Sequence, residues 1–170
     1  MSRAAFGSLI VAALLVAVAG RLWALDRRPM HHDEAIQAVK FGALLETGEY
    51  RYDANDHHGP TLYYLTLPFA WARGQTTLAS LDEWTVRAVP ATFGAALILL
   101  FPLLSAGIGR TAAAAGAWLA AISPALTYFS RFYIQEWLFI WCAVAFLIAL
   151  GHHVQRPRMA TAVWAGVFAG

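Results

Sequence analysis

The chain has 170 residues, of which 59% are hydrophobic and only 13% are charged. Soluble domains carry about 25% charged residues, so this composition excludes an ordinary soluble domain and indicates a membrane protein. The net charge of +2 is small and the basic residues do not cluster, which excludes a nucleic-acid-binding surface. A single cysteine, Cys142, cannot form a disulfide within the chain.

Apolar stretches long enough to cross a membrane recur along the chain. A transmembrane helix needs about 20 apolar residues, and the stretches that meet or approach this length are 4–25, 88–108, 111–129 and 137–154. Pro124 predicts a kink in the third stretch because proline has no N–H group. The fifth stretch, 160–170, is about half a span, so we expect residues 1–170 to be the N-terminal part of one longer transmembrane domain.

The first stretch also has the features of a signal peptide. Arg3 precedes an apolar run that contains Ala17-Val18-Ala19, an A-x-A cleavage box. The run continues to Leu25, which favours an uncleaved first span.

Charge divides between the two ends of these spans. Nine of the ten carboxylates lie between Asp26 and Glu83, and the tenth is Glu136. The opposite side carries arginine and no acid: Arg3, Arg110, Arg156 and Arg158. The positive-inside rule therefore predicts a multi-pass protein of the cell membrane with loop 26–87 on the extracytoplasmic side. Arg27 and Arg28 alone favour the reverse orientation.

Loop 26–87 contains two segments that we expect to be helices on the membrane surface. In 33–45, apolar residues recur at helical spacing (Ile36, Val39, Ala43 and Leu44), opposite a polar stripe (Asp33, Gln37 and Lys40). Segment 61–72 is apolar and aromatic but too short to span, and Pro60 begins it.

Asp33 and Glu34 are the first candidates for chemistry. Two carboxylates at a helix start often serve only to cap N–H groups and complement the helix dipole. Alternatively, a carboxylate at a partly dehydrated membrane surface can act as a general base toward an attacking hydroxyl.

The second candidate is the turn His57-His58-Gly59-Pro60, in which Gly59 permits unusual backbone angles and a histidine could contact phosphate. With His31 and His32 it could also hold a divalent metal, although no zinc-binding motif is present and no cofactor is certain. The simpler interpretation is a polar turn.

The third group is Arg87, Arg131 and Glu136, at the extracytoplasmic ends of the predicted spans. Arginine suits phosphate oxygens, but it also commonly extends to a membrane interface, and Glu136 could cap a helix or pair with Arg131. The four complete spans carry no ionisable residue at mid-depth, which argues against an ion-coupled transporter.

Taken together, Asp33-Glu34, His58-Gly59-Pro60, Arg87 and the segment SRFYIQE (130–136) resemble the C-type polytopic glycosyltransferases. These include the dolichyl-phosphate-mannose protein mannosyltransferases and the aminoarabinose transferases. The chain is most similar to a prokaryotic branch called flippase-activity-associated proteins, and the likeness covers essentially all 170 residues.

The resemblance implies an all-α transmembrane bundle that transfers a sugar, with inversion, from a polyprenyl-phosphate donor to a protein, lipid or glycan hydroxyl. It gives Asp33 the role of general base and Glu34 a supporting role. Arg87, Arg131 and the His58-Gly59-Pro60 turn would bind the lipid phosphate, and Glu136 would position sugar or acceptor. Two alternatives stay open: a non-catalytic subunit or transporter for lipid-linked saccharides, and a metal-dependent membrane hydrolase.

Overall fold

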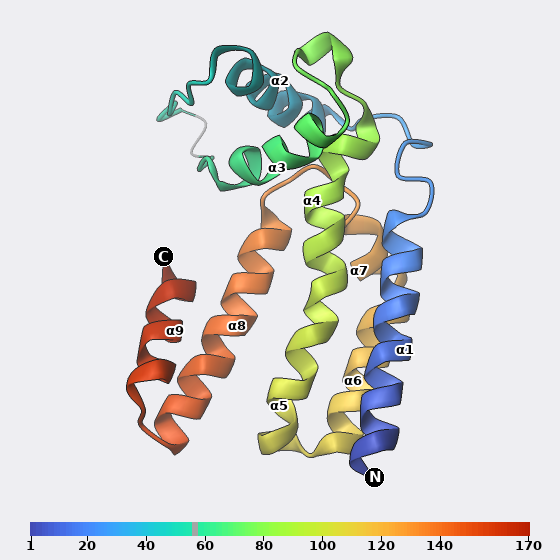
Figure 1. Cartoon of the computed structure of the whole chain (residues 1–170), viewed down its shortest axis with the longest axis vertical. Coiled ribbons are helices and arrows are strands. Elements are labelled where there is room, and N and C mark those ends of the chain that lie inside the picture. Colours follow the sequence, from blue (N-terminus) through green and yellow to red (C-terminus); the bar gives the residue numbers. More distant parts are fainter. Residues whose placement is uncertain (56–57) are drawn as a thin grey trace.

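The computed structural model describes residues 1–55 and 58–170, and within these ranges its regular structure is entirely helical. In chain order the elements are α1 (Arg3–Leu22), α2 (His32–Thr47), α3 (Thr61–Ala72), η1 (Leu78–Ser80), α4 (Glu83–Ala96), η2 (Leu97–Leu100), α5 (Phe101–Ile108), α6 (Arg110–Ile122), α7 (Pro124–Phe129), α8 (Glu136–Gln155) and α9 (Met159–Ala169). α1, α6, α8 and the continuous rod α4–η2–α5 run side by side, while α2 and α3 lie across one end of them (Figure 1).

Among the residues that the structure describes, three helical segments are long and apolar enough to cross a membrane: Arg3–Leu22, Glu83–Ile108 and Glu136–Gln155. They agree with the expected spans 4–25, 88–108 and 137–154, except that the second begins five residues earlier than predicted. Asp82 starts it, because its carboxylate accepts a hydrogen bond from the N–H of Thr85 at 2.8 Å and caps the helix.

The third expected span, 111–129, is broken at Pro124, as the sequence predicts. Ser123 is extended and separates α6 from α7. Proline has no N–H to offer the carbonyl of Ala120, four residues earlier. Arg21, which is fully buried, donates to that carbonyl at 3.0 Å and to the carbonyl of Ala121 at 3.4 Å. Arg21, near the end of the first span, therefore supplies hydrogen-bond donors to carbonyls at the helix break in the third expected span.

Small residues bring α1 and α6 together. The core between them consists largely of alanine: Ala13, Ala17, Ala117, Ala120 and Ala121 are all buried. Small side chains allow helix backbones to approach closely, which is the usual way helices associate inside a membrane.

α2 begins with a reciprocal cap between His31 and Glu34 and ends at Gly48, whose φ of 74° suits glycine. Its buried face differs from the predicted apolar stripe. Of that stripe only Leu44 is buried, whereas Ile36 and Val39 are exposed and Gln37, expected on the polar side, is buried. Helical spacing identifies an apolar face of a helix, but it does not indicate whether that face packs against the rest of the protein or is exposed on its surface. Gln37 is accommodated because its side chain accepts a hydrogen bond from Tyr63.

α3 begins after Pro60, as expected, and packs with α2 against the top of α4. The shared core contains Phe41, Leu62, Val86 and Tyr133. The segment before α8 thus lies under both crossing helices, and this arrangement brings the predicted site residues to one end of the bundle.

Candidate functional site

Glu34, which is itself fully buried, is the centre of a polar cluster where α2, α4 and the segment before α8 meet. One carboxylate oxygen accepts from Arg87 Nε at 2.7 Å and from the N–H of Tyr133 at 3.0 Å. The other accepts from Arg87 Nη2 at 3.0 Å, from Arg28 Nη2 at 2.9 Å and from the N–H of His31 at 2.9 Å. Five donors on one carboxylate leave Glu34 little capacity to accept a proton from a substrate.

The pKa of Glu34 reflects this environment. Burial alone would raise it, but hydrogen bonds from Arg87 and from the N–H groups of His31 and Tyr133, together with the Arg87 charge, outweigh the burial. The pKa therefore lies below the ordinary glutamate value, and Glu34 is ionised at neutral pH.

Arg87 is also saturated. Besides its two bonds to Glu34, it donates to the carbonyls of Leu25 at 2.7 Å, Arg28 at 2.9 Å and Pro29 at 3.3 Å. All five N–H groups of its guanidinium are then used. In this arrangement Arg87 fastens the turn after α1 to the start of α2. Its expected contact with phosphate stays a prediction, and it would require some of these bonds to open.

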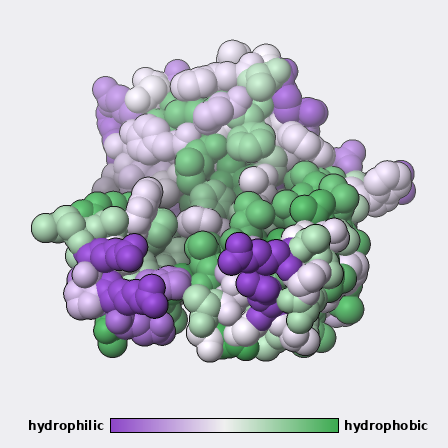
Figure 2. All heavy atoms as spheres, turned by 60° about the horizontal axis from the view of Figure 1, so that its bottom comes forward, coloured by the Kyte–Doolittle hydropathy of each residue, from purple (hydrophilic) through white to green (hydrophobic). Residues whose placement is uncertain are grey.

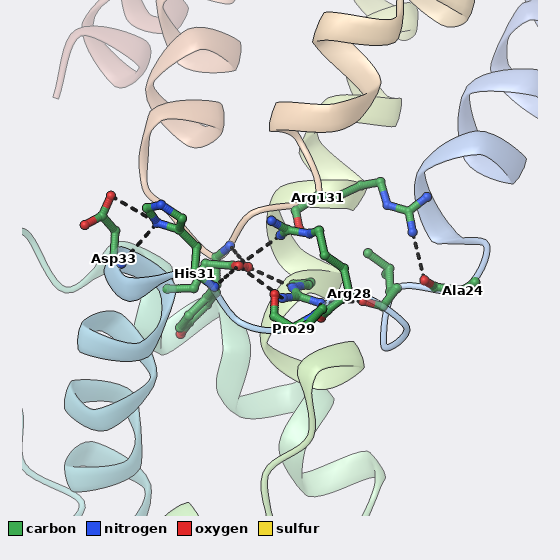
Figure 3. A network of polar contacts seen from close by, with 10 residues as sticks. Ala24, Arg28, Pro29, His31, Asp33 and Arg131 are labelled. Atoms are coloured by element: carbon green, nitrogen blue, oxygen red, sulfur yellow. Dashed lines mark hydrogen bonds and ion pairs between the residues drawn. The ribbon is translucent and has the colours of Figure 1, made fainter.

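Asp33 lies next to Glu34 but in a different environment, since its side chain is 66% exposed. Its N–H donates to His31 Nδ1 at 3.3 Å, which requires the neutral imidazole. Its carboxylate lies 3.4 Å from the same nitrogen, a contact that becomes an ion pair only when the ring is protonated. Figure 3 shows this pair on one side of the polar network, away from the arginines. Of the two adjacent acids, only Asp33 is open to a substrate.

Asp33 faces a cavity of about 490 Å³. The same cavity is lined by two other predicted site residues, His58 and Glu136, and by His31. Glu136 is exposed at the first position of α8. The aromatic side chains of Tyr128, Phe129 and Phe132 complete much of the lining. The structure therefore brings two carboxylates and two histidines, from three separate parts of the chain, to one aromatic-walled cavity.

The turn that carries His58 is held in place through its backbone. Tyr50 donates to the carbonyl of His58 at 2.5 Å, and the side-chain amide of Gln135 donates to the carbonyl of Gly59 at 2.6 Å. Gly59 itself has no positive φ and has room for a Cβ, so the unusual backbone angles that glycine permits are not adopted at this position. Pro60 contributes by starting α3.

Arg131 lies in a second, smaller cavity of about 260 Å³, which Arg28 also lines. Arg131 donates to the carbonyl of Gly20 at 3.0 Å. It also donates to the carbonyl of Ala24 at 2.8 Å (Figure 3). Burial and the neighbouring charges of Arg28 and Arg87 lower the pKa of Arg131. Two cations held this close indicate a place that favours an anion.

The two cavities share a wall. Tyr128 lines both, and Phe132, which lines the larger one, carries the Arg28 guanidinium on its ring at 3.7 Å from the centroid. An acidic cavity and a cationic cavity are thus separated by two aromatic rings.

Sequence reasoning did not find Arg28 or His31 as partners of the two acids. From the sequence, Arg28 bears only on membrane orientation and His31 only on metal binding. The capping-box spacing, with Glu34 three residues after His31, was the available signal.

In the described part of the chain, no group of three or more His, Cys, Asp or Glu side chains could hold a metal ion. His57, one of the histidines considered for a metal, lies outside the described residues. Comparisons with protein-family models, with curated proteins and with solved structures found no match for this chain.

Proposed function

We propose that this protein is a membrane glycosyltransferase that moves a sugar from a polyprenyl-phosphate donor to an acceptor hydroxyl. The observation that carries the proposal is the cavity shared by Asp33, His58 and Glu136 at one end of the apolar helices, next to the Arg28–Arg131 cavity. A lipid-linked sugar has matching chemistry: an uncharged polyhydroxy ring joined to an anionic phosphate, with a hydrocarbon chain that stays in the membrane.

In the proposed reaction, Asp33 takes the proton from the acceptor hydroxyl while that oxygen attacks the anomeric carbon of the sugar. A new carbon–oxygen bond forms on one face of the carbon as the bond to the phosphate oxygen breaks on the other, which inverts the configuration. The electron pair of the broken bond leaves with the polyprenyl phosphate. Asp33 has the required access to a substrate, because its side chain is 66% exposed and lines the cavity.

Arg28 and Arg131 are the residues we assign to the leaving phosphate. Positive groups fixed near developing negative charge stabilise a transition state without reorganising. Arg131 keeps its orientation through two backbone carbonyls, and Arg28 is held by Glu34 and the Phe132 ring. Glu34 then acts as a positioning residue: it closes the first turn of α2, from which Asp33 projects.

The test uses membranes that contain the protein, supplied with a panel of radiolabelled polyprenyl-phosphate sugars. Wild type is compared with Asp33→Asn and with Asp53→Asn, an exposed aspartate of the same loop that does not line the cavity. We expect label transfer by wild type and Asp53→Asn, and a loss of about 100-fold or more in Asp33→Asn, the scale of general base catalysis.

Undiminished transfer by Asp33→Asn would remove this residue from catalysis. If no donor supports transfer by wild type, yet donor lipid is retained in a manner that depends on Arg28 and Arg131, the glycosyltransferase proposal fails in favour of a non-catalytic lipid-handling subunit.

A further inference from the structure

The end of the molecule opposite α2 and α3 carries a second polar region that the proposed reaction does not use. Every acidic residue of the described chain lies elsewhere, and this end carries arginines: Arg3, Arg110, Arg156 and Arg158. Figure 2 looks toward this end and shows hydrophilic residues in two groups on a largely apolar surface, one on the side of α8 and α9 and one on the side of α1 and α6.

The group at α8 and α9 surrounds a cavity of about 430 Å³. Arg156 and Arg158 line it from the connection between the two helices, together with His152, Gln155 and Thr161. Neither guanidinium has a hydrogen-bond or ion-pair partner in the described structure, whereas Thr161 is engaged with the Arg158 carbonyl at 2.8 Å. Two arginines without acidic partners favour an anionic ligand.

A second cavity of about 470 Å³ continues from this one between α5, α8 and α9. His152 and Thr161 line both cavities, so the two have a common boundary. The imidazole is fixed there, because its Nε2 donates to the Leu103 carbonyl at 3.0 Å. Beyond this boundary the lining is almost entirely apolar and includes Trp141 and Trp164.

The combination is a cationic mouth joined to an apolar chamber, and both volumes are within the range of about 300–1,000 Å³ usual for ligand cavities. We propose that it binds one anionic glycerophospholipid of the bilayer. The phosphate would contact Arg156 and Arg158, and a hydrocarbon chain would lie in the chamber against Trp141 and Trp164. Basic pockets between transmembrane helices bind acidic headgroups for the same electrostatic reason.

This lipid is not the sugar donor. α8 has 20 residues and therefore separates Glu136 from Gln155 by roughly 30 Å at 1.5 Å per residue. A phosphate at Arg156 and Arg158 is thus far from the Asp33 cavity. The site is therefore separate from the one we propose for the transfer reaction.

The test is native mass spectrometry of the protein released from bilayer nanodiscs of phosphatidylcholine mixed with phosphatidylglycerol. We expect wild type to retain one phosphatidylglycerol in preference to phosphatidylcholine. Arg156→Gln/Arg158→Gln should reduce that preference at least about fivefold. The matched control, Arg3→Gln/Arg110→Gln, removes the same charge from the same end but does not line the cavity, and it should keep the preference.

A second variant tests the apolar chamber. Leu99 lines it and is half exposed, so Leu99→Trp should fill space there and weaken retention of either lipid without changing the headgroup preference. Equal loss in both arginine pairs would reduce the effect to general surface charge and overturn the proposal. Retention of no lipid would mean that protein fills the chamber, and this would also overturn the proposal. When polyprenyl phosphate is added to the nanodiscs, its retention in preference to phosphatidylglycerol would make this a donor site and would overturn the proposal as well.

Discussion

Replacing Glu34 by glutamine tests whether the buried cluster holds the site together. The carboxylate has three donors on one oxygen and two on the other. In glutamine one oxygen becomes an NH2 group, which cannot accept. At least two hydrogen bonds are therefore lost whichever way the amide turns, and two arginines lose their negative partner.

The magnitude follows from these contacts. Hydrogen bonds to charged groups contribute about 1.5–3 kcal/mol each, and breaking a buried ion pair from one side costs about 3–5 kcal/mol. We expect Glu34→Gln to lower the free energy of unfolding by about 4 kcal/mol. For a chain of this length, that corresponds to a decrease in Tm of roughly 10 °C.

The assay is thermal unfolding of the purified protein in detergent, followed by tryptophan fluorescence. Asp33→Asn is the matched control because it makes the same chemical change at the adjacent residue, whose side chain is 66% exposed. Substitutions at such positions usually change stability by less than about 0.5 kcal/mol. Equal Tm values for the two variants would refute the assignment of Glu34 as the structural anchor and Asp33 as the open acid.

Three further outcomes follow from the structure. The pKa of Glu34 is lowered in the folded state, so ionised Glu34 stabilises the fold fully above the ordinary carboxyl pKa of about 4.3, and this contribution is lost as pH falls through the lowered pKa. The Tm should therefore fall more steeply in acid for wild type than for Glu34→Gln. Gly94→Ala should cost about 1–3 kcal/mol, since the added carbon would lie 2.4 Å from a side-chain carbon, whereas Gly7→Ala meets nothing within 4 Å and should be neutral or slightly stabilising in the same unfolding assay. Arg21→Leu should destabilise the Pro124→Ala variant by about 1 kcal/mol less than it destabilises wild type, because the alanine of that variant supplies an N–H that can bond to the Ala120 carbonyl. Equal losses of unfolding free energy in the two backgrounds would contradict the role of Arg21 at the helix break.

The helices could largely be anticipated from the sequence because their signals are local. Apolar runs of about 20 residues predict spans, Pro60 predicts the start of α3, and Pro124 predicts the break after α6. Each signal is a property of a few consecutive residues, so no tertiary information was needed.

The partners of the ionisable residues could not be anticipated in the same way. Arg21 bonds to carbonyls that lie 99 and 100 residues away, and the Tyr133 N–H reaches Glu34 across 99 residues. The residue types of Asp33 and Glu34 do not distinguish them, although the family resemblance gives them different roles. Their opposite burial separates a structural carboxylate from an open one. Arg28 stayed unnoticed because its role depends on the Phe132 ring lying beneath it.

In the reaction we propose, Asp33 removes a proton from the acceptor hydroxyl during sugar transfer. This step is tested most directly by measuring transfer and donor retention together, in membranes that contain Asp33→Asn. We predict that transfer falls about 100-fold or more while retention of the labelled donor stays at the wild-type level, since Asp33 does not line the Arg28–Arg131 cavity. Transfer within a few-fold of wild type would contradict the claim.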